Sequence, residues 1–66
     1  MYIYINGEKT ECPDGSTIAA ILTQLDVPPT GTAVACNDAV VRKALYAETI
    51  LREGDRIEII HAVAGG

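Results

Sequence analysis

Apolar and polar side chains alternate over the first six residues of the chain. Tyr2 and Tyr4 would point to one side of a strand there, and three apolar side chains would point to the other, namely Met1, Ile3 and Ile5. A period of two with β-branched and aromatic residues is typical of a β-strand. Asn6-Gly7 follows, and this dipeptide is the strongest local signal for a hairpin because both positions tolerate positive φ. We therefore expect residues 8–12 to form an antiparallel return strand.

A helical pattern begins after the turn signal Pro13-Asp14-Gly15. Four apolar residues follow the spacing i, i+3, i+4, i+7 and form one stripe, namely Ile18, Ile21, Leu22 and Leu25. Either Ser16 or Thr17 can cap the N-terminus, because a hydroxyl oxygen accepts a hydrogen bond from a free amide of the first turn. Pro28 disfavours the α conformation at Val27. The pattern thus predicts a helix of about ten residues that ends before the two prolines.

The second half of the chain has the pattern of short strands between turns. Small and branched residues fill positions 32–37, and a Val-Val pair follows the turn signal Asn37-Asp38. Residues 44–51 are ambiguous and fit a single helical turn. The last strand is expected over residues 56–62, after a turn at 53–55.

This order of two strands, a helix and further strands predicts an α+β domain of the β-grasp type. Such a domain has a mixed sheet of roughly four to five strands with one main helix across one face. Its first and last strands pair in parallel at the centre of the sheet, so the last strand would end in mid-sheet. Residues 1–62 would then form the domain, and residues 63–66 a flexible tail.

Composition supports one small domain and limits the classes of partner that it is expected to bind. The chain has 66 residues, of which 48% are hydrophobic, and this suffices for one core. Its net charge is −4, with only five Lys and Arg residues, which argues against nucleic-acid binding and favours a protein partner with a basic patch. The sequence has neither an apolar run of membrane-spanning length nor a signal-peptide pattern. We therefore expect a cytoplasmic protein that does not enter a membrane.

The sequence ends in Gly65-Gly66, directly after the last predicted strand. A free α-carboxyl group has a pKa of about 3.5 and is a poorly electrophilic anion at neutral pH. It must be activated before a nucleophile can attack it, and formation of an acyl-adenylate with ATP in another protein would do so. Val63 to Gly66 span at most about 13–14 Å when extended. Glycines have no side chains, so the end of this tail fits a narrow channel.

A second candidate site is the outer face of the sheet. If Ile57 and Ile59 face the helix, Ile60 and Ala62 face outward, beside the two N-terminal tyrosines, Tyr2 and Tyr4. Clustered aromatic and aliphatic side chains suit a docking surface, although isolated surface hydrophobic residues are also normal. The sequence leaves both interpretations open.

No other set of residues indicates catalysis or metal binding. Cys12 and Cys36 lack CxxC spacing and are interpreted as small buried hydrophobic residues. His61 has no partner in a recognisable motif and is interpreted as structural or solvent-facing. The sequence contains no P-loop, Ser/His/Asp set or metal-ligand spacing. We therefore expect no bound cofactor and no metal ion.

Taken with the predicted strand order, several segments resemble those of a known family. They are "IYING", "DGSTIAAIL", "AVACNDAVVRK", "LREGDRIEIIHAV" and the closing "AGG". Over essentially its whole length the chain resembles the ThiS family, the small sulfur carriers of thiamine biosynthesis. The resemblance implies a ubiquitin-like β-grasp fold and a protein that serves as a co-substrate rather than as an enzyme.

The resemblance also implies partners and roles for the tail. A ThiF-like adenylyltransferase would use ATP and Mg to activate Gly66, and sulfur from a cysteine desulfurase or another donor would convert it to a thiocarboxylate. A ThiG-like thiazole synthase would accept that sulfur. Gly65 would give access to the reacting end, and Ala64 and Val63 would help to seat the tail.

Three other functions stay open at this point. The first is a molybdopterin-type sulfur carrier, although the absence of Phe from this chain favours the thiamine branch. The second is a ubiquitin-like modifier that is conjugated to lysines through its C-terminus. The third is an interaction module whose terminal glycines have no chemical role.

Overall fold

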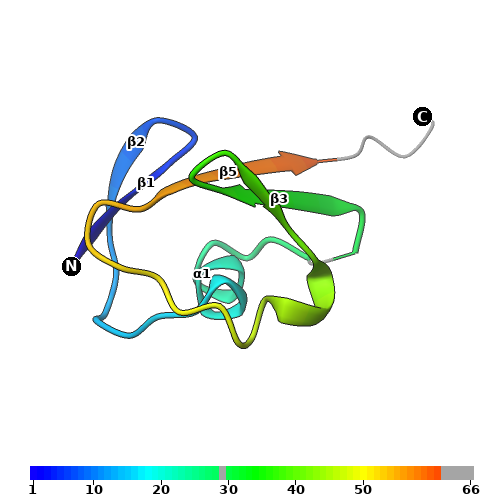
Figure 1. Ribbon diagram of the computed structural model, residues 1–66, viewed down its shortest axis with the longest axis horizontal. Helices are drawn as coiled ribbons and strands as arrows, with labels where there is room; N and C mark the ends of the chain where they lie inside the picture. Colours follow the sequence, from blue (N-terminus) through cyan, green and yellow to red (C-terminus); the bar gives the residue numbers. More distant parts are fainter. Residues whose placement is uncertain (29, 62–66) are drawn as a thin grey trace.

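The computed structural model describes residues 1–28 and 30–61, which form a five-stranded sheet with one helix on one face (Figure 1). The strands lie in the order β2-β1-β5-β3-β4. Their bounds are β1 Tyr2–Ile5, β2 Glu8–Glu11, β3 Thr32–Cys36, β4 Ala39–Val41 and β5 Arg56–His61. β1 and β5 pair in parallel at the centre, and the other pairs are antiparallel. The predicted mixed sheet of the β-grasp type is therefore confirmed.

The two hairpins form where the sequence predicts them. Asn6 and Gly7 have φ values of 51° and 83°, and Asn37 and Asp38 have values of 50° and 70°. Positive φ at both central positions is the pattern of a type I′ turn, whose twist matches that of the flanking strands. The register follows from these turns, since Ile5 pairs with Glu8 across the first hairpin.

Helix α1 spans Ile18–Gln24 and is shorter than predicted. It begins as expected, because the Thr17 side chain accepts a hydrogen bond of 3.1 Å from the Ala20 amide. It ends at Gln24, before the position at which Pro28 would disfavour the α conformation of Val27. Asp26 adopts φ 58°, and the Val27 amide donates to the Leu22 carbonyl over 2.8 Å, which is the 6→1 bond of a Schellman motif.

The ambiguous segment after β4 contains one short 3₁₀ helix, η1, over Lys43–Leu45. The chain then runs past the start of α1, where Leu51 donates to the Ser16 carbonyl over 2.8 Å. Tyr46, at the end of η1, is 5% exposed and belongs to the core. The predicted single helical turn is thus confirmed, although it packs a tyrosine that the strand and helix patterns did not assign to the core.

The core lies between the sheet and α1. Its members are the inward side chains of β1, α1, β3 and β5 together with three residues from connecting segments: Ile3, Ile5, Ile18, Ile21, Leu22, Val34, Ile57, Ile59, Cys12, Tyr46 and Leu51. Leu25, predicted to complete the helical stripe, is 38% exposed instead. It is the C-cap residue of α1, so the helix ends before this side chain can turn fully inward. None of the helices in the described ranges is long and apolar enough to cross a bilayer.

Candidate functional site

The predicted tail and its candidate site residues Val63, Ala64, Gly65 and Gly66 lie outside the described residues, and so does Ala62 of the predicted docking face. The division into a domain over residues 1–62 and a tail over 63–66 therefore stays a prediction. The structure does describe β5, the strand that leads into this segment. The candidate site that the structure describes consists of β5 and the surface around it.

β5 extends further than β1, the strand that pairs with it on one side. Its parallel pairing with β1 ends at Ile57, opposite Ile5. On its other side, antiparallel pairing with β3 continues to His61, opposite Thr32. β5 therefore ends in the middle of the sheet, with a neighbouring strand on only one side of its last residues. This arrangement was expected from the β-grasp order.

Tyr2, Tyr4 and Ile60 all lie on the outer face, opposite the helix layer. Their side chains are 42%, 39% and 56% exposed, and each lies next to a buried residue of its own strand, Ile3 or Ile59. The prediction that they share a face is confirmed. The prediction that they lie beside one another is wrong, because Tyr4 pairs with Arg56, and Ile60 lies four residues further along β5, about 13 Å away.

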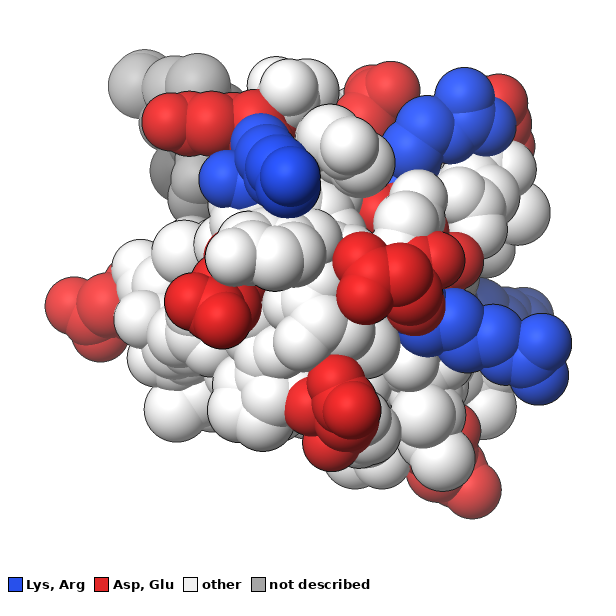
Figure 2. All heavy atoms as spheres, turned by 90° about the vertical axis from the view of Figure 1, so that its left-hand side faces the viewer, with Lys and Arg blue, Asp and Glu red and all other residues white. Residues whose placement is uncertain are grey.

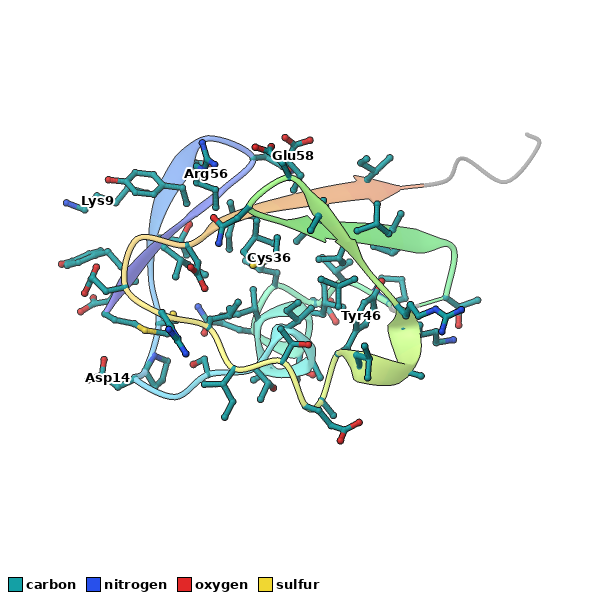
Figure 3. All side chains as sticks on the ribbon, viewed as in Figure 1. Lys9, Asp14, Cys36, Tyr46, Arg56 and Glu58 are labelled. Carbon is teal, nitrogen blue, oxygen red and sulfur yellow. The ribbon has the colours of Figure 1, made fainter. Side chains whose placement is uncertain are left out.

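Charged side chains separate the two ends of this face. Arg56 and Glu58 project from β5 away from the helix layer (Figure 3). They line a shallow open groove of about 380 Å³ together with Tyr4 and Asp38. Arg56 forms an ion pair of 3.4 Å with Asp38, and their side chains are 67% and 81% exposed. A pair this exposed adds little stability, on the order of 0–1 kcal/mol.

Ile60 has apolar neighbours that sequence reasoning missed. Ala33 pairs with Ile60 across β3 and β5, and Ala35 pairs with Val40 across β3 and β4. Val40 is 81% exposed. We call these four residues (Ile60, Ala33, Ala35 and Val40) the outer apolar patch. The alternation around the buried Val34 indicates the outward direction of the two alanines. Only the strand register reveals that Ala33 lies opposite Ile60 and that Ala35 lies between Val40 and Glu58.

The tyrosine end of the face is polar by comparison. The Lys9 ammonium lies 4.5 Å from the centre of the Tyr2 ring, and the Tyr2 amide donates a hydrogen bond of 2.9 Å to the Glu53 carboxylate. Figure 2 views the end of the molecule that carries the N-terminus and shows acidic side chains spread across it, with basic side chains in fewer places. This distribution agrees with the net charge of −4.

The two cysteines are free thiols. Cys12 is 3% exposed and belongs to the core. Burial, and then the nearby Asp55 carboxylate, raise the pKa of the Cys36 thiol. A protonated thiol is a weak nucleophile, which supports the interpretation of Cys36 as a packing residue. Within residues 1–28 and 30–61, no cluster of three or more His, Cys, Asp and Glu residues is placed to hold a metal ion.

Comparison with known proteins gives consistent matches. A model of the ThiS family matches residues 3–66. The sulfur carrier protein ThiS of Escherichia coli is 35% identical over 66 residues, and the match covers both chains completely. A thiazole synthase of Magnetococcus marinus is 38% identical over 66 residues, but this chain spans only 20% of its length. The crystal structure of a thiamine biosynthesis protein, ThiS, from Geobacter metallireducens superimposes with a TM-score of 0.86 over the whole of both chains, at 22% identity.

Proposed function

The chain belongs to the ThiS family, and on this premise we propose that it is a sulfur carrier protein of thiamine biosynthesis. The observation that carries the proposal is the extent of the match. The family model runs through residue 66, so Gly65 and Gly66 fall within it. The fold supports the same function, because β5 ends in mid-sheet and leads directly into this segment.

We propose that the Gly66 carboxylate is the group that carries sulfur. A ThiF-like partner enzyme would bind ATP and Mg, and a carboxylate oxygen would attack the α-phosphorus and release pyrophosphate. A persulfide, formed by a cysteine desulfurase or another sulfur donor, would then displace AMP at the Gly66 carbonyl and give an acyl disulfide. A second thiol, such as that of free cysteine, would reduce this disulfide, form a disulfide with the donor and leave a thiocarboxylate on Gly66. The thiocarboxylate is a stronger nucleophile than the carboxylate it replaces, and its covalent attachment avoids the release of free sulfide.

In this scheme the domain is a co-substrate and its partners are the enzymes. Gly65 gives the reacting end access to a narrow channel because it has no side chain, and Ala64 and Val63 seat the tail. The ATP and Mg belong to the partner. We place these steps in the cytoplasm.

The outer face of the sheet is the proposed docking surface for the adenylating partner. The outer apolar patch includes Ile60, one residue before the end of β5, so a partner that binds the tail would also contact the patch. Tyr2 and Tyr4, at the far end of the face, would lie at the rim of such an interface. Interfaces commonly have an apolar centre and a polar rim.

Thiazole synthase is the proposed acceptor of the sulfur. A segment similar to this chain makes up 20% of two proteins named thiazole synthase, from Magnetococcus marinus and Paramagnetospirillum magneticum. This similarity favours a sulfur carrier with a ThiG-like partner over a molybdopterin-type sulfur carrier.

The test is an intact mass measurement after incubation with ATP, Mg, cysteine, the adenylating partner and a desulfurase. Replacement of one oxygen by sulfur in the C-terminal peptide is the expected result. Adducts linked to lysines in a cell extract would favour a ubiquitin-like modifier instead. An unchanged mass, with the partner enzyme proven active on another carrier, would contradict the proposal.

A further inference from the structure

Two asparagines at the type I′ turns direct their side chains at the backbone of β5. Asn6 follows β1 and Asn37 follows β3, so they approach β5 from opposite sides. Both have positive φ, which turns the residue's own carbonyl away from the strand ladder. In each case the side chain amide takes the place of the carbonyl that has turned away.

Asn6 makes three hydrogen bonds with β5. Its backbone amide donates to the Ile57 carbonyl over 2.8 Å. Its side chain Oδ1 accepts from the Ile59 amide over 2.9 Å, and its Nδ2 donates to the Ile59 carbonyl over 3.4 Å. A side chain amide has the same donor and acceptor groups as a peptide. Asn6 therefore extends the parallel ladder by one step, although β1 itself has ended.

This step lies where β5 has no strand beside it on the β1 side. The backbone pairing with β1 ends at Ile57, and β5 continues to His61. On the β1 side of Ile59, the Asn6 side chain provides both of the hydrogen bonds found between the described residues. The opposite side of β5 is held by β3 as far as Thr32.

Asn37 repeats the arrangement at the other end of β5. Its backbone amide donates to the Arg56 carbonyl over 2.7 Å, and its Oδ1 accepts from the Arg56 amide over 3.0 Å. Its Nδ2 donates to the Asp55 carboxylate over 3.1 Å. Asn37 thus holds the first residue of the strand, whereas Asn6 holds the strand close to its last residue.

We propose that Asn6 is a positioning residue for sulfur loading, which fixes the direction in which the chain leaves β5 towards Gly66. This inference rests on the proposed function. An activated carboxyl group must reach its attacking atom within a narrow range of geometry, and misplacement by about 1 Å costs as much as about a hundredfold in rate. Conformational freedom of the backbone at Ile59 would change the direction of every later residue. It would therefore raise the entropy cost of ordering the tail in a partner's channel.

The test compares Asn6→Gly with the matched variant Asn37→Gly. Glycine adopts positive φ without strain, so both turns keep their conformation. Asn6→Gly loses the side chain bonds to Ile59, and Asn37→Gly loses those to Arg56, Asp55 and Cys36. We expect Asn6→Gly to lower kcat/KM for thiocarboxylate formation by about five- to tenfold, mainly through a higher KM for the carrier. Asn37→Gly should stay close to wild type.

Two further measurements separate positioning from general stability. Amide hydrogen exchange at Ile59 should become faster in Asn6→Gly and not in Asn37→Gly. Asn6→Asp keeps the oxygen acceptor but places a second oxygen against the Ile59 carbonyl. This variant is nearly isosteric, so it should fold while also losing kcat/KM.

The possible outcomes are distinct. Equal losses of kcat/KM in the two glycine variants, or faster exchange at Ile59 with unchanged kinetics, would overturn the positioning role and leave the carrier function intact. If the wild-type protein gains no sulfur from a proven active partner, the carrier function fails and the positioning role fails with it.

Discussion

At the scale of single residues, Thr17 determines where α1 begins. Its hydroxyl oxygen accepts from the Ala20 amide over 3.1 Å, one of the amides that a helix start leaves without a partner. Thr17→Ala should therefore lower the free energy of unfolding by about 1 kcal/mol. Thr17→Ser keeps the hydroxyl and should stay close to wild type. Denaturant unfolding measures both, and an equal loss in the two variants would rule out the cap as the cause.

The N-terminal ammonium of Met1 makes stability depend on pH. A hydrogen bond with Asp14 is the main cause that raises the ammonium pKa above its ordinary value of 8.0. A raised pKa in the folded state means that the stabilisation is complete below the unfolded pKa and is lost as pH rises through the folded pKa. The free energy of unfolding should therefore fall as pH increases above about 8.

Asp14→Asn is the control for this pH dependence, because the Cys36 thiol, whose pKa is also raised by burial, destabilises the fold in the same alkaline range. The variant removes the carboxylate that lies 3.0 Å from the ammonium and leaves Cys36 in place. The alkaline loss of stability should be smaller in the variant than in wild type. Identical pH profiles would show that the Met1–Asp14 pair does not contribute.

At the scale of secondary-structure elements, the outer apolar patch on β3, β4 and β5 is the proposed contact for the adenylating partner. Ile60→Ser should weaken binding of that partner by about tenfold, because it removes an aliphatic side chain from the centre of the interface. Ile50→Ser is the matched control, since Ile50 is 63% exposed but forms a bridge with Thr17 beside the helix. Calorimetry with the purified partner measures both affinities. A similar loss in the two variants would contradict docking on the outer face.

The elements also show how far the sequence predicts this structure. Strands and hairpins could be predicted because strand periodicity and two Asn-containing turns are local signals. The end of α1 could not, since Asp26 adopts positive φ at a position where glycine would have been the recognisable signal. The outward direction of Ile60 follows from alternation, but its distance from Tyr4 depends on the parallel register of β1 and β5, which no local pattern specifies.

At the scale of the whole molecule, packing and hydrogen bonds hold the central strand β5 in place near both of its ends. β5 lies between β1 and β3, its inner side chains Ile57 and Ile59 are 2% and 7% exposed, and asparagine side chains hold its backbone near both ends. A partner can therefore bind the segment after β5 without disturbing the core. With a net charge of −4, association with a basic partner should also slow as ionic strength rises.

Every step of the proposed function depends on the attachment of sulfur to the carboxyl group of Gly66. The most direct measurement is the mass of the C-terminal peptide after loading, for the wild-type protein and for a variant extended by one residue after Gly66. We expect one sulfur in place of oxygen on Gly66 of the wild type and none on the extended protein, which should keep its fold. Sulfur at the end of the extended protein, or at any other residue of the wild type, would contradict this expectation.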